Sequence, residues 1–339
     1  MSEPQRCGGR LRLGAGPHGV CGEGAQHLFL GVLCLCLALC LTLANWQVVT
    51  NQNVVGHQDR AEMHREVLAN RADLPYQYHM YLIAHATQWL HDALGVPLRG
   101  AFIAMFGLVY LFALVSSWYW LAQLWKGPAP IVLGLLAVAA YGGVMLGCSD
   151  HHPSDPFGAG LLALTLAWAA QGNWGRGVGA ALIAGFFWTK GVLVGPAIAL
   201  YGGLSGSWRR GWGWALAVTA AAAVGPAIYR LALGPHPLVE EGTLASREWI
   251  AALPKAAVLH LGLAGPVLCT LALNWGKIPA VLRAAMAIYP AQVCAYAVAG
   301  QFLYEPRSFW ALVPVFAAVL GVWGEGVCPG AGSSGPLRE

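Results

Sequence analysis

The sequence is poor in charged residues. Asp, Glu, Lys and Arg make up 10% of its 339 residues, whereas soluble domains carry about 25%. Together with 57% hydrophobic residues and a mean hydropathy of +0.56, this shortage excludes an ordinary soluble domain and indicates a polytopic membrane protein. The net charge of +4 is spread over many positions, so the basic face that nucleic-acid binding requires is missing too.

Cysteine spacings that bind metal are also lacking. No Cys-x-x-Cys pair and no zinc-finger spacing occurs among the nine cysteines. Five of them fall inside apolar stretches, where cysteine behaves as a small buried hydrophobe: Cys34, Cys36, Cys40, Cys269 and Cys294. The cysteines therefore give no indication of a structural zinc site.

Long apolar runs dominate instead. They fall at about 28–45, 100–125, 129–148, 157–171, 177–203, 212–233, 256–275, 279–300 and 308–324. About 20 apolar residues cross a bilayer, so we predict an all-α, polytopic transmembrane helix bundle with about eight or nine membrane segments over residues 27–324. The runs are dense in Gly and Ala, which let helices approach closely.

The two ends of the chain are more polar. Residues 1–26 hold Arg6, Arg10 and Arg12 ahead of the first apolar run, a pattern shared with secretory signals. Because the cleavage site is poor and further spans follow, we expect an uncleaved first helix behind a cytoplasmic tail. The Gly- and Ser-rich residues 325–339 predict a disordered C-terminal tail.

Basic residues in short loops predict the orientation, because cytoplasmic loops retain Lys and Arg. They place the N-terminus, Lys126 and Arg176 in the cytoplasm and the loops 46–99 and 149–157 outside. A simple crossing by residues 177–203 would then put Arg209 and Arg210 outside as well. We therefore expect that run to be re-entrant, with a turn near Thr189-Lys190-Gly191 that faces the same side as the loops 46–99, 149–157, 234–256 and 301–308.

The loop 46–99 is the longest polar stretch before the middle of the chain. Asp59, Glu62 and Glu66 lie along one face of a helix-spaced segment. Residues 76–90 place aromatic residues at helical intervals, which predicts an amphipathic helix at the membrane interface. The alternative for most of these side chains is a solvated face and an interfacial aromatic belt.

A second polar loop, residues 148–157, gathers carboxylates and imidazoles between two apolar runs. Asp150, Asp155 and His151 are candidate ligands for Mg²⁺ or Mn²⁺, and the adjacent His152 would also allow zinc. The alternative is a helix start, in which Asp155 is the cap and Pro156 is the first helical residue.

Two further positions carry charge inside or beside apolar runs. Lys190 lies in the middle of one, where an ionisable side chain is costly and often functional. It is a candidate for neutralising a phosphate, or it marks the aqueous turn of the re-entrant run. Glu305 and Arg307 stand before the last run, where they can bind a substrate or pair with each other.

Together these stretches resemble the C-type superfamily of integral-membrane glycosyltransferases (GT-C), in particular its poorly characterised bacterial members, over about residues 28–323. In that family an acidic residue follows the first span, and an aromatic segment precedes the next one. The positions that correspond here are Asp59 and Pro75-Tyr76-Gln77-Tyr78-His79, followed by Asp155, Thr189-Lys190-Gly191 and Glu305-Pro306-Arg307. Here His79 stands in place of the usual Arg and Gly191 in place of Glu, and the aromatic residues expected after the first acid are absent.

The resemblance implies an enzyme of the cytoplasmic (inner) membrane, with membrane lipid and a polyprenyl-phosphate sugar as partners. The sugar would pass with inversion to an acceptor on the outer face. Asp59 would be the general base, and Lys190 and Arg307 would stabilise the leaving phosphate, with a metal held by Asp150 or Asp155. The implied substrate-binding residues are Lys190, Arg307, Glu305, His79 and Tyr78.

Two other functions fit the same composition. One is a non-catalytic membrane subunit that uses the loop 46–99 as a docking surface, which the departures from the family pattern favour. The other is transport, which would require ionisable groups or broken helices in paired halves of the chain. Only the run 177–203 has that character.

Overall fold

A computed structural model describes residues 20–50, 68–69, 74–148, 153–187, 189–233, 247–299 and 306–326. These residues form helices and the turns between them, with no strand among them. Four of the helices are long and apolar enough to cross a membrane, at Gly24–Asn45, Leu98–Leu124, Trp208–Ala232 and Pro254–Leu273. The expected class, a helical membrane bundle, is confirmed at this level.

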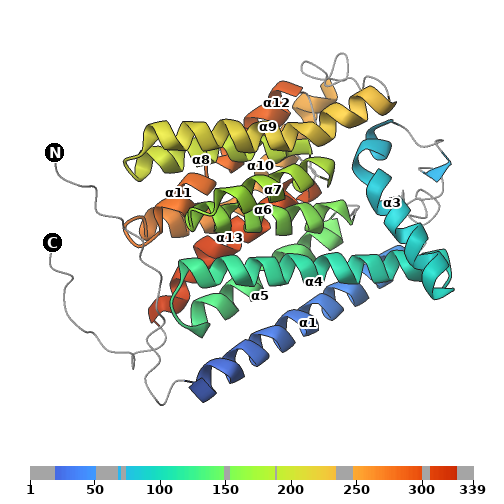
Figure 1. The fold of residues 1–339 in the computed structure, drawn as a ribbon, viewed down its shortest axis with the longest axis horizontal. Coiled ribbons are helices and arrows are strands. Elements are labelled where there is room, and N and C mark those ends of the chain that lie inside the picture. Colours follow the sequence, from blue (N-terminus) through green and yellow to red (C-terminus); the bar gives the residue numbers. More distant parts are fainter. Residues whose placement is uncertain are drawn as a thin grey trace.

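The elements follow one another in a simple order (Figure 1). They are α1 (Val20–Thr50), α3 (Leu74–Leu94), α4 (Leu98–Leu124), α5 (Pro128–Cys148), α6 (Ser154–Ala170), α7 (Trp174–Phe187), η1 (Thr189–Leu193), α8 (Val194–Leu204), α9 (Trp208–Leu233), α10 (Arg247–Leu273), α11 (Ala280–Ala285), α12 (Ile288–Ala299), η3 (Pro306–Leu312), α13 (Val313–Leu320) and η4 (Gly321–Gly326).

Apart from α3 and the broken run of α11 and α12, successive helices run in alternate directions. The His27 ring of α1 lies 5.8 Å from the Trp118 ring of α4, and Thr42 of α1 packs beside Gly107 of α4, so α1 and α4 are antiparallel. The bundle therefore has two ends. We call the end where α1, α5, α9 and α12 finish the loop end, and the end with the turns at 125–127, 171–173, 205–207 and 274–279 the basic end.

Three prolines set the positions where apolar runs break. Proline lacks an N–H donor, and its ring clashes with the carbonyl four residues earlier, which disrupts an α-helix. Four residues before Pro196, Pro290 and Pro314 lie η1, the turn at 286–287 and η3, respectively. The runs 177–203, 279–300 and 308–324 are thus divided, whereas α9 and α10 continue through their internal prolines.

The run 177–203 reverses direction at η1. The rings of Trp174 and Trp214 stack near the starts of α7 and α9, and Tyr229 of α9 contacts Phe186 at the end of α7. Helix α7 therefore runs parallel to α9. In contrast, Gly202 at the end of α8 meets Gly211 at the start of α9, so α8 runs back to the end at which α7 began. The chain turns at the residues 189–191 where the sequence predicted a turn.

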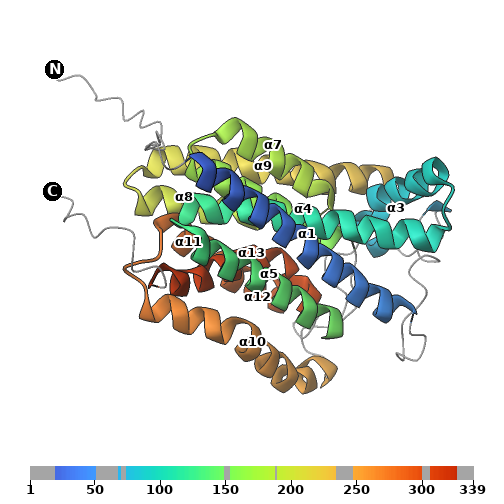
Figure 2. The ribbon, with the colours of Figure 1, turned by 90° about the horizontal axis from the view of Figure 1, so that it is seen from below.

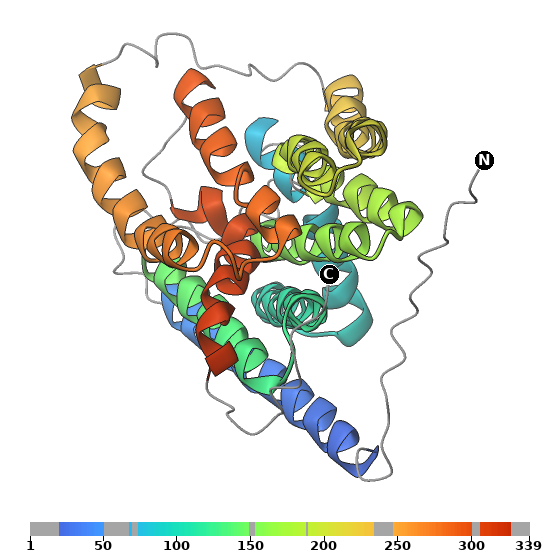
Figure 3. The same cartoon turned by 90° about the vertical axis from the view of Figure 1, so that its left-hand side faces the viewer.

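The last helix lies at the centre of the bundle. Every residue of Val313–Val319 is buried, as expected for a helix that is apolar on all sides. Helices α5, α6 and α10 pack around α13, and Trp125 Nε1–H donates a hydrogen bond to Ala318 O at 3.0 Å. The core of the molecule therefore forms around its C-terminal segment (Figure 3).

The first helix lies on the outside and shows two different faces. It crosses α4 and α5 (Figure 2). Its inner face consists of Leu30, Cys34, Ala38 and Leu41, each less than 5% exposed. Its outer face carries Leu28, Val32, Leu35, Leu39 and Leu43, which are 48–71% exposed. An exposed apolar stripe of this length suits contact with lipid chains.

The contact between α7 and α9 depends on glycine. A Cβ atom added to Gly185 would lie 2.3 Å from the backbone oxygen of Ala222, which leaves no room for a side chain. We expect Gly185→Ala to lower the free energy of unfolding by about 1–3 kcal/mol, as overpacking does. Thermal unfolding of the detergent-purified protein measures the effect.

Gly179→Ala in the same helix is the matched control, because a Cβ atom there meets nothing within 4 Å. Replacing a helical glycine by alanine in open space favours the helix by up to about 1 kcal/mol. The control should therefore be as stable as the wild type or more stable. Equal melting temperatures for both variants would contradict the close approach of α7 to α9.

Candidate functional site

Three of the predicted site residues belong to short elements at or facing the loop end. Asp155 lies at the start of α6, Lys190 in η1 and Arg307 in η3. Helix α6 packs against both α7 and η3, and α12 packs against both η1 and η3. The fold thus links three segments that lie far apart in the sequence through shared neighbouring helices.

Asp155 is half-buried in the first turn of α6. The prediction that Asp155 caps this helix is wrong, because α6 begins one residue earlier, at Ser154. The cap position is Pro153, and no side chain makes a capping hydrogen bond. A carboxylate in the first turn is nevertheless favoured by the helix dipole.

Tyr110 of α4 lies in the neighbourhood of Asp155. The Tyr110 side chain is fully buried, and its hydroxyl has no hydrogen-bond partner among the described residues. The Asp155 carboxylate is close enough to act on this hydroxyl electrostatically. On its other side, the Tyr110 ring lies 6.1 Å from the Trp310 ring of η3. Tyr110 therefore lies between α6 and η3.

Aromatic rings hold α4, α6 and α7 at one level. Phe112 stacks on Phe157 with ring centres 4.8 Å apart, and Phe157 meets Phe187 edge-on at 4.6 Å. Since Phe112 lies halfway along α4, the start of α6 and the end of α7 lie beside the middle of that long helix. The Asp155 carboxylate thus lies deeper in the bundle than the ends of α1 and α4.

Lys190 lies where the chain turns between α7 and α8. Its element, η1, packs against α7 and α9. Close by, the Tyr229 hydroxyl donates a hydrogen bond to the Phe186 carbonyl at 3.1 Å, which binds the last turn of α7 to α9. The backbone of Lys190 is therefore held at a fixed break in the bundle. Its side chain lies outside the described residues.

Arg307 belongs to η3, whose neighbouring side chains are deeply buried. Phe309 and Trp310 are each 1% exposed. The Phe309 ring contacts His260 of α10 edge-on at 4.8 Å, and His260 Nδ1 lies 2.9 Å from the Tyr289 hydroxyl. These contacts fix η3 between α6 and α10. The Arg307 side chain lies outside the described residues.

Helix α3 crosses the loop end and contacts α4, α6, α7 and α9 (Figure 1). Its residues include the segment 76–90 for which the sequence predicts a helix. Ile83, Ala84 and Thr87 face inward, and the Tyr81 ring lies 6.3 Å from the Tyr229 ring. Tyr78 and His79 lie one turn earlier in the same helix, and their side chains are outside the described residues. Helix α3 therefore lies across the loop end and packs against α6 and α7 there.

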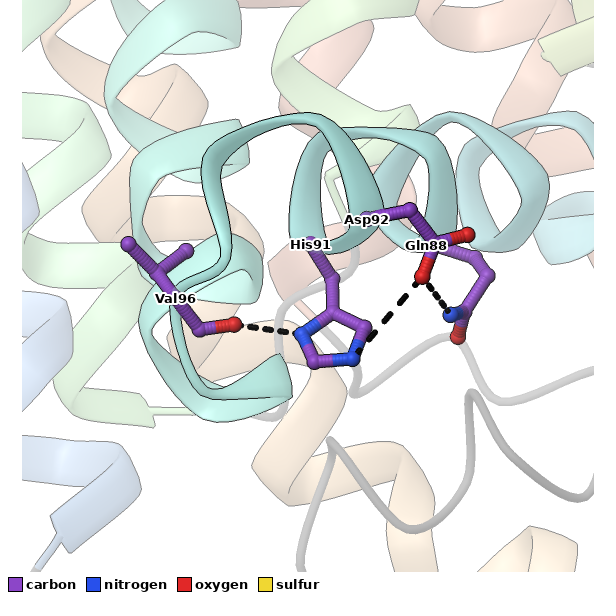
Figure 4. Close-up of polar contacts among 4 residues, drawn as sticks. All are labelled: Gln88, His91, Asp92 and Val96. Carbon is purple, nitrogen blue, oxygen red and sulfur yellow. Dashed lines mark hydrogen bonds and ion pairs between the residues drawn. The ribbon is translucent and has the colours of Figure 1, made fainter.

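The corner between α3 and α4 is closed by local polar contacts (Figure 4). His91 Nδ1 meets the Val96 carbonyl oxygen, which requires a proton on that nitrogen, and the Gln88 amide donates to the Asp92 carboxylate at 2.8 Å. His91 Nε2 lies 3.9 Å from the same carboxylate. Gly95, with φ of 63°, supplies the left-handed turn. These contacts fix the angle between α3 and α4.

Several predicted residues fall outside the description. Asp59, Glu305, Asp150 and His151 all lie there. Among the described residues, no group of three or more His, Cys, Asp or Glu is arranged to hold a metal ion. The predicted Mg²⁺ or Mn²⁺ site therefore stays a prediction, with Asp155 as its one described member.

Comparison with protein-family models, with curated proteins and with solved structures finds no match for this chain.

Reasoning from the sequence overlooked Tyr110 and Trp310. Both lie inside apolar runs, where they look like ordinary core residues. One signal was available, because a tyrosine in the middle of an otherwise apolar span brings a hydroxyl that needs a partner when it is buried. The contact with η3 depends on tertiary packing and has no local signature.

The role of the Tyr110 hydroxyl, which has no partner in the part of the chain that the structure describes, can be tested by substitution. A buried polar group without a partner costs about 1–3 kcal/mol, and phenylalanine keeps the ring contacts with Phe106 and Trp310. We expect Tyr110→Phe to be at least as thermostable as the wild type and Tyr110→Ala to be strongly destabilised. A clear loss of stability in Tyr110→Phe would show that the hydroxyl is hydrogen-bonded to a residue outside the description.

Proposed function

We propose that this protein is a GT-C-like membrane glycosyltransferase. It transfers a sugar from a polyprenyl-phosphate donor to an acceptor on the outer face of the membrane. The observation that carries the proposal is that α6, the element of Asp155, packs against η3, the element of Arg307, and that α12 packs against both η3 and η1, the element of Lys190. A phosphate with a sugar attached needs such a mixture of acid and cation within one small region.

The first step of the argument is orientation. The described turns of the basic end and the helix ends beside them carry Lys126, Arg176, Arg209, Arg210 and Lys277. Because cytoplasmic loops retain positive charge, this end faces the cytoplasm and the loop end faces outward. The run 177–203 is then a re-entrant hairpin, since α7 begins and α8 ends on the cytoplasmic side.

The second step is the position of the base. Residue 59 lies in the segment that joins α1 to α3, and both of these helices reach the loop end. The same end holds the first turn of α6 and the turn at η1. This arrangement allows Asp59 to approach the region of Lys190 and Arg307 without crossing the bundle.

The third step is the chemistry. The acceptor hydroxyl attacks the anomeric carbon of the sugar, and the bond from that carbon to the phosphate oxygen breaks with inversion. Asp59 takes the hydroxyl proton as the new bond forms, which is general base catalysis. The departing polyprenyl phosphate gains negative charge, and Lys190 and Arg307 stabilise it where little water is present.

A lipid-linked donor also explains why the first turn of α6, with Asp155, lies deep in the bundle. The prenyl chain stays among the bilayer lipids, and its phosphate enters at the depth where α6 begins. Because the start of α6 lies beside the middle of α4, a donor attached to the membrane reaches it more readily than a soluble sugar nucleotide does. The exposed residues Leu82, His85 and Trp89 form one outward-facing stripe on α3, which suits an interfacial helix that lies against the lipid.

Asp59→Asn tests the catalytic role directly. Asparagine keeps the size of the side chain but cannot accept the proton, so the rate of sugar transfer should fall by about 10²–10⁴-fold. The assay uses membranes that contain the protein and radiolabelled polyprenyl-phosphate sugars. Asp92→Asn is the matched control, because Asp92 is an exposed carboxylate at the α3–α4 corner, and its rate should stay within about twofold of the wild type. Equal turnover in the wild type and Asp59→Asn would remove Asp59 as the base.

Cysteine labelling tests the orientation independently of activity. In a cysteine-free background, we expect Thr243→Cys to react with a membrane-impermeant maleimide on intact cells. Ser207→Cys, in the turn between α8 and α9, should react only after the cells are permeabilised. Reaction of both residues from the same side would rule out the hairpin arrangement of α7 and α8 within the membrane.

A further inference from the structure

The basic end contains a cavity of about 160 Å³ that the proposed transfer reaction does not use. It lies among the last turns of α6 and α8 and the first turns of α7 and α9. Tyr201, Ser205, Ser207 and Arg210 supply its polar groups, and the Trp174 ring forms part of its wall. Of the described residues that line the cavity, Arg210 is the one that carries a charge.

Small residues leave room for this cavity. Gly202 and Gly211 approach so closely that an added Cβ atom on Gly202 would lie 2.5 Å from the Gly211 Cα atom. The backbones of α8 and α9 therefore touch, and little side-chain volume fills the space beside them. Ser205 Oγ donates to the Tyr201 carbonyl at 2.8 Å and lies 3.5 Å from Ser207 Oγ. These contacts hold two hydroxyls side by side at the edge of the cavity.

Tryptophan side chains place the cavity at the depth of lipid headgroups. The Trp174 and Trp214 rings stack with centres 5.0 Å apart and planes 6° from parallel. Four other tryptophans at this end are about half exposed: Trp208, Trp212, Trp275 and Trp323. Tryptophan is enriched where the bilayer meets water. The mouth of the cavity, where Arg210 is exposed, thus lies in the headgroup layer.

The charge around the cavity favours an anion. Arg176 and Arg210 stand at the starts of α7 and α9, and Arg283 lies over the Trp275 ring at 5.1 Å. Among the described side chains of this end, Glu325 is the one carboxylate, and it belongs to η4 rather than to the α6–α9 corner. A phosphate group that enters the cavity therefore meets cationic and hydroxyl donors and no acid.

We propose that this cavity binds the phosphate of an anionic glycerophospholipid from the leaflet at the basic end. The Arg210 guanidinium pairs with the phosphate oxygens, and the hydroxyls of Ser207 and Tyr201 donate to the same group. Basic pockets between membrane helices bind lipid headgroups in this way. A lipid is favoured over free phosphate because the tryptophans hold the cavity in the layer where lipid phosphates are concentrated. The inference is independent of the transfer reaction.

Native mass spectrometry of the detergent-purified protein tests the proposal. The probes are phosphatidylglycerol and phosphatidylcholine of the same chain length, each titrated at fixed ionic strength. We expect the wild type to retain phosphatidylglycerol in preference to phosphatidylcholine. Arg210→Ala should weaken phosphatidylglycerol binding about tenfold, which is the loss of one charge-assisted hydrogen bond. The affinity of Arg210→Lys for phosphatidylglycerol should lie between those of the wild type and Arg210→Ala, because lysine keeps the charge but loses the paired donors.

Arg209→Ala is the matched control, since Arg209 is an equally exposed neighbour that does not line the cavity. It should bind phosphatidylglycerol within about twofold of the wild type. Equal losses in Arg209→Ala and Arg210→Ala would indicate general attraction to a basic surface and would overturn the cavity site. Displacement of the lipid by millimolar inorganic phosphate would identify free phosphate as the ligand and would overturn the lipid assignment. An unchanged melting temperature in Arg210→Ala confirms that any loss reflects binding.

Discussion

Backbone hydrogen bonding in an apolar environment is the constraint on which this structure depends. Within a bilayer, a peptide group without a partner costs several kcal/mol, so non-helical backbone is tolerated only where protein or a wet cavity surrounds it. The chain breaks its helices at η1, at residues 286–287 and at η3. Each break must therefore be covered by neighbouring helices. The dense glycine and alanine of the apolar runs allow this, because they bring the covering helices into backbone contact.

The cover over η1 shows how this works. Helix α9 is long and continuous, and α7 and α8 lie along it in opposite directions, with Gly185 and Gly202 at two close approaches of the backbones. The Tyr229 hydroxyl of α9 donates a hydrogen bond to the Phe186 carbonyl in the last turn of α7. Lipid chains could not supply such a donor. A larger residue at either glycine would separate the helices and expose the break. The position of Lys190 thus depends on residues that carry no polar chemistry themselves.

Proline chemistry and hydropathy made much of the fold predictable. The nine apolar runs correspond to helices or helix pairs, and the turn near Thr189-Lys190-Gly191 follows from an excess of arginine on one side together with Pro196. The breaks beside Pro290 and Pro314 could have been predicted by the same rule. The start of α6 could not be predicted in this way, because the sequence Pro153-Ser154-Asp155-Pro156 allows a helix to begin at several positions. The packing of Phe157 against Phe112 favours one of them.

The candidate site was less predictable than the fold, for a physical reason. Acidic and basic residues in an apolar sequence are conspicuous, so Asp155, Lys190 and Arg307 attract attention as single positions. What joins their elements is a set of aromatic contacts from α4, α6, α7 and η3, and aromatic residues in apolar runs look alike in sequence. Tyr110 has the same local context as many core residues, and what distinguishes it is its hydroxyl, which has no partner among the described residues, and its ring contact with Trp310.

The two ends of the bundle are built on different principles, and this separates their roles. The basic end has short turns, exposed tryptophans and surface arginines, residues that are typical of the interface between bilayer and water. The loop end has broken helices and a covering helix, α3, which bring distant segments together. The cavity around Arg210 and the turn at η1 lie at opposite ends of α8, so the free-energy effects of substitutions at the two places should add. A substitution at the basic end that altered the proposed sugar transfer would therefore act through α7, α8 or α9, since each of these helices joins the cavity to the turn at η1.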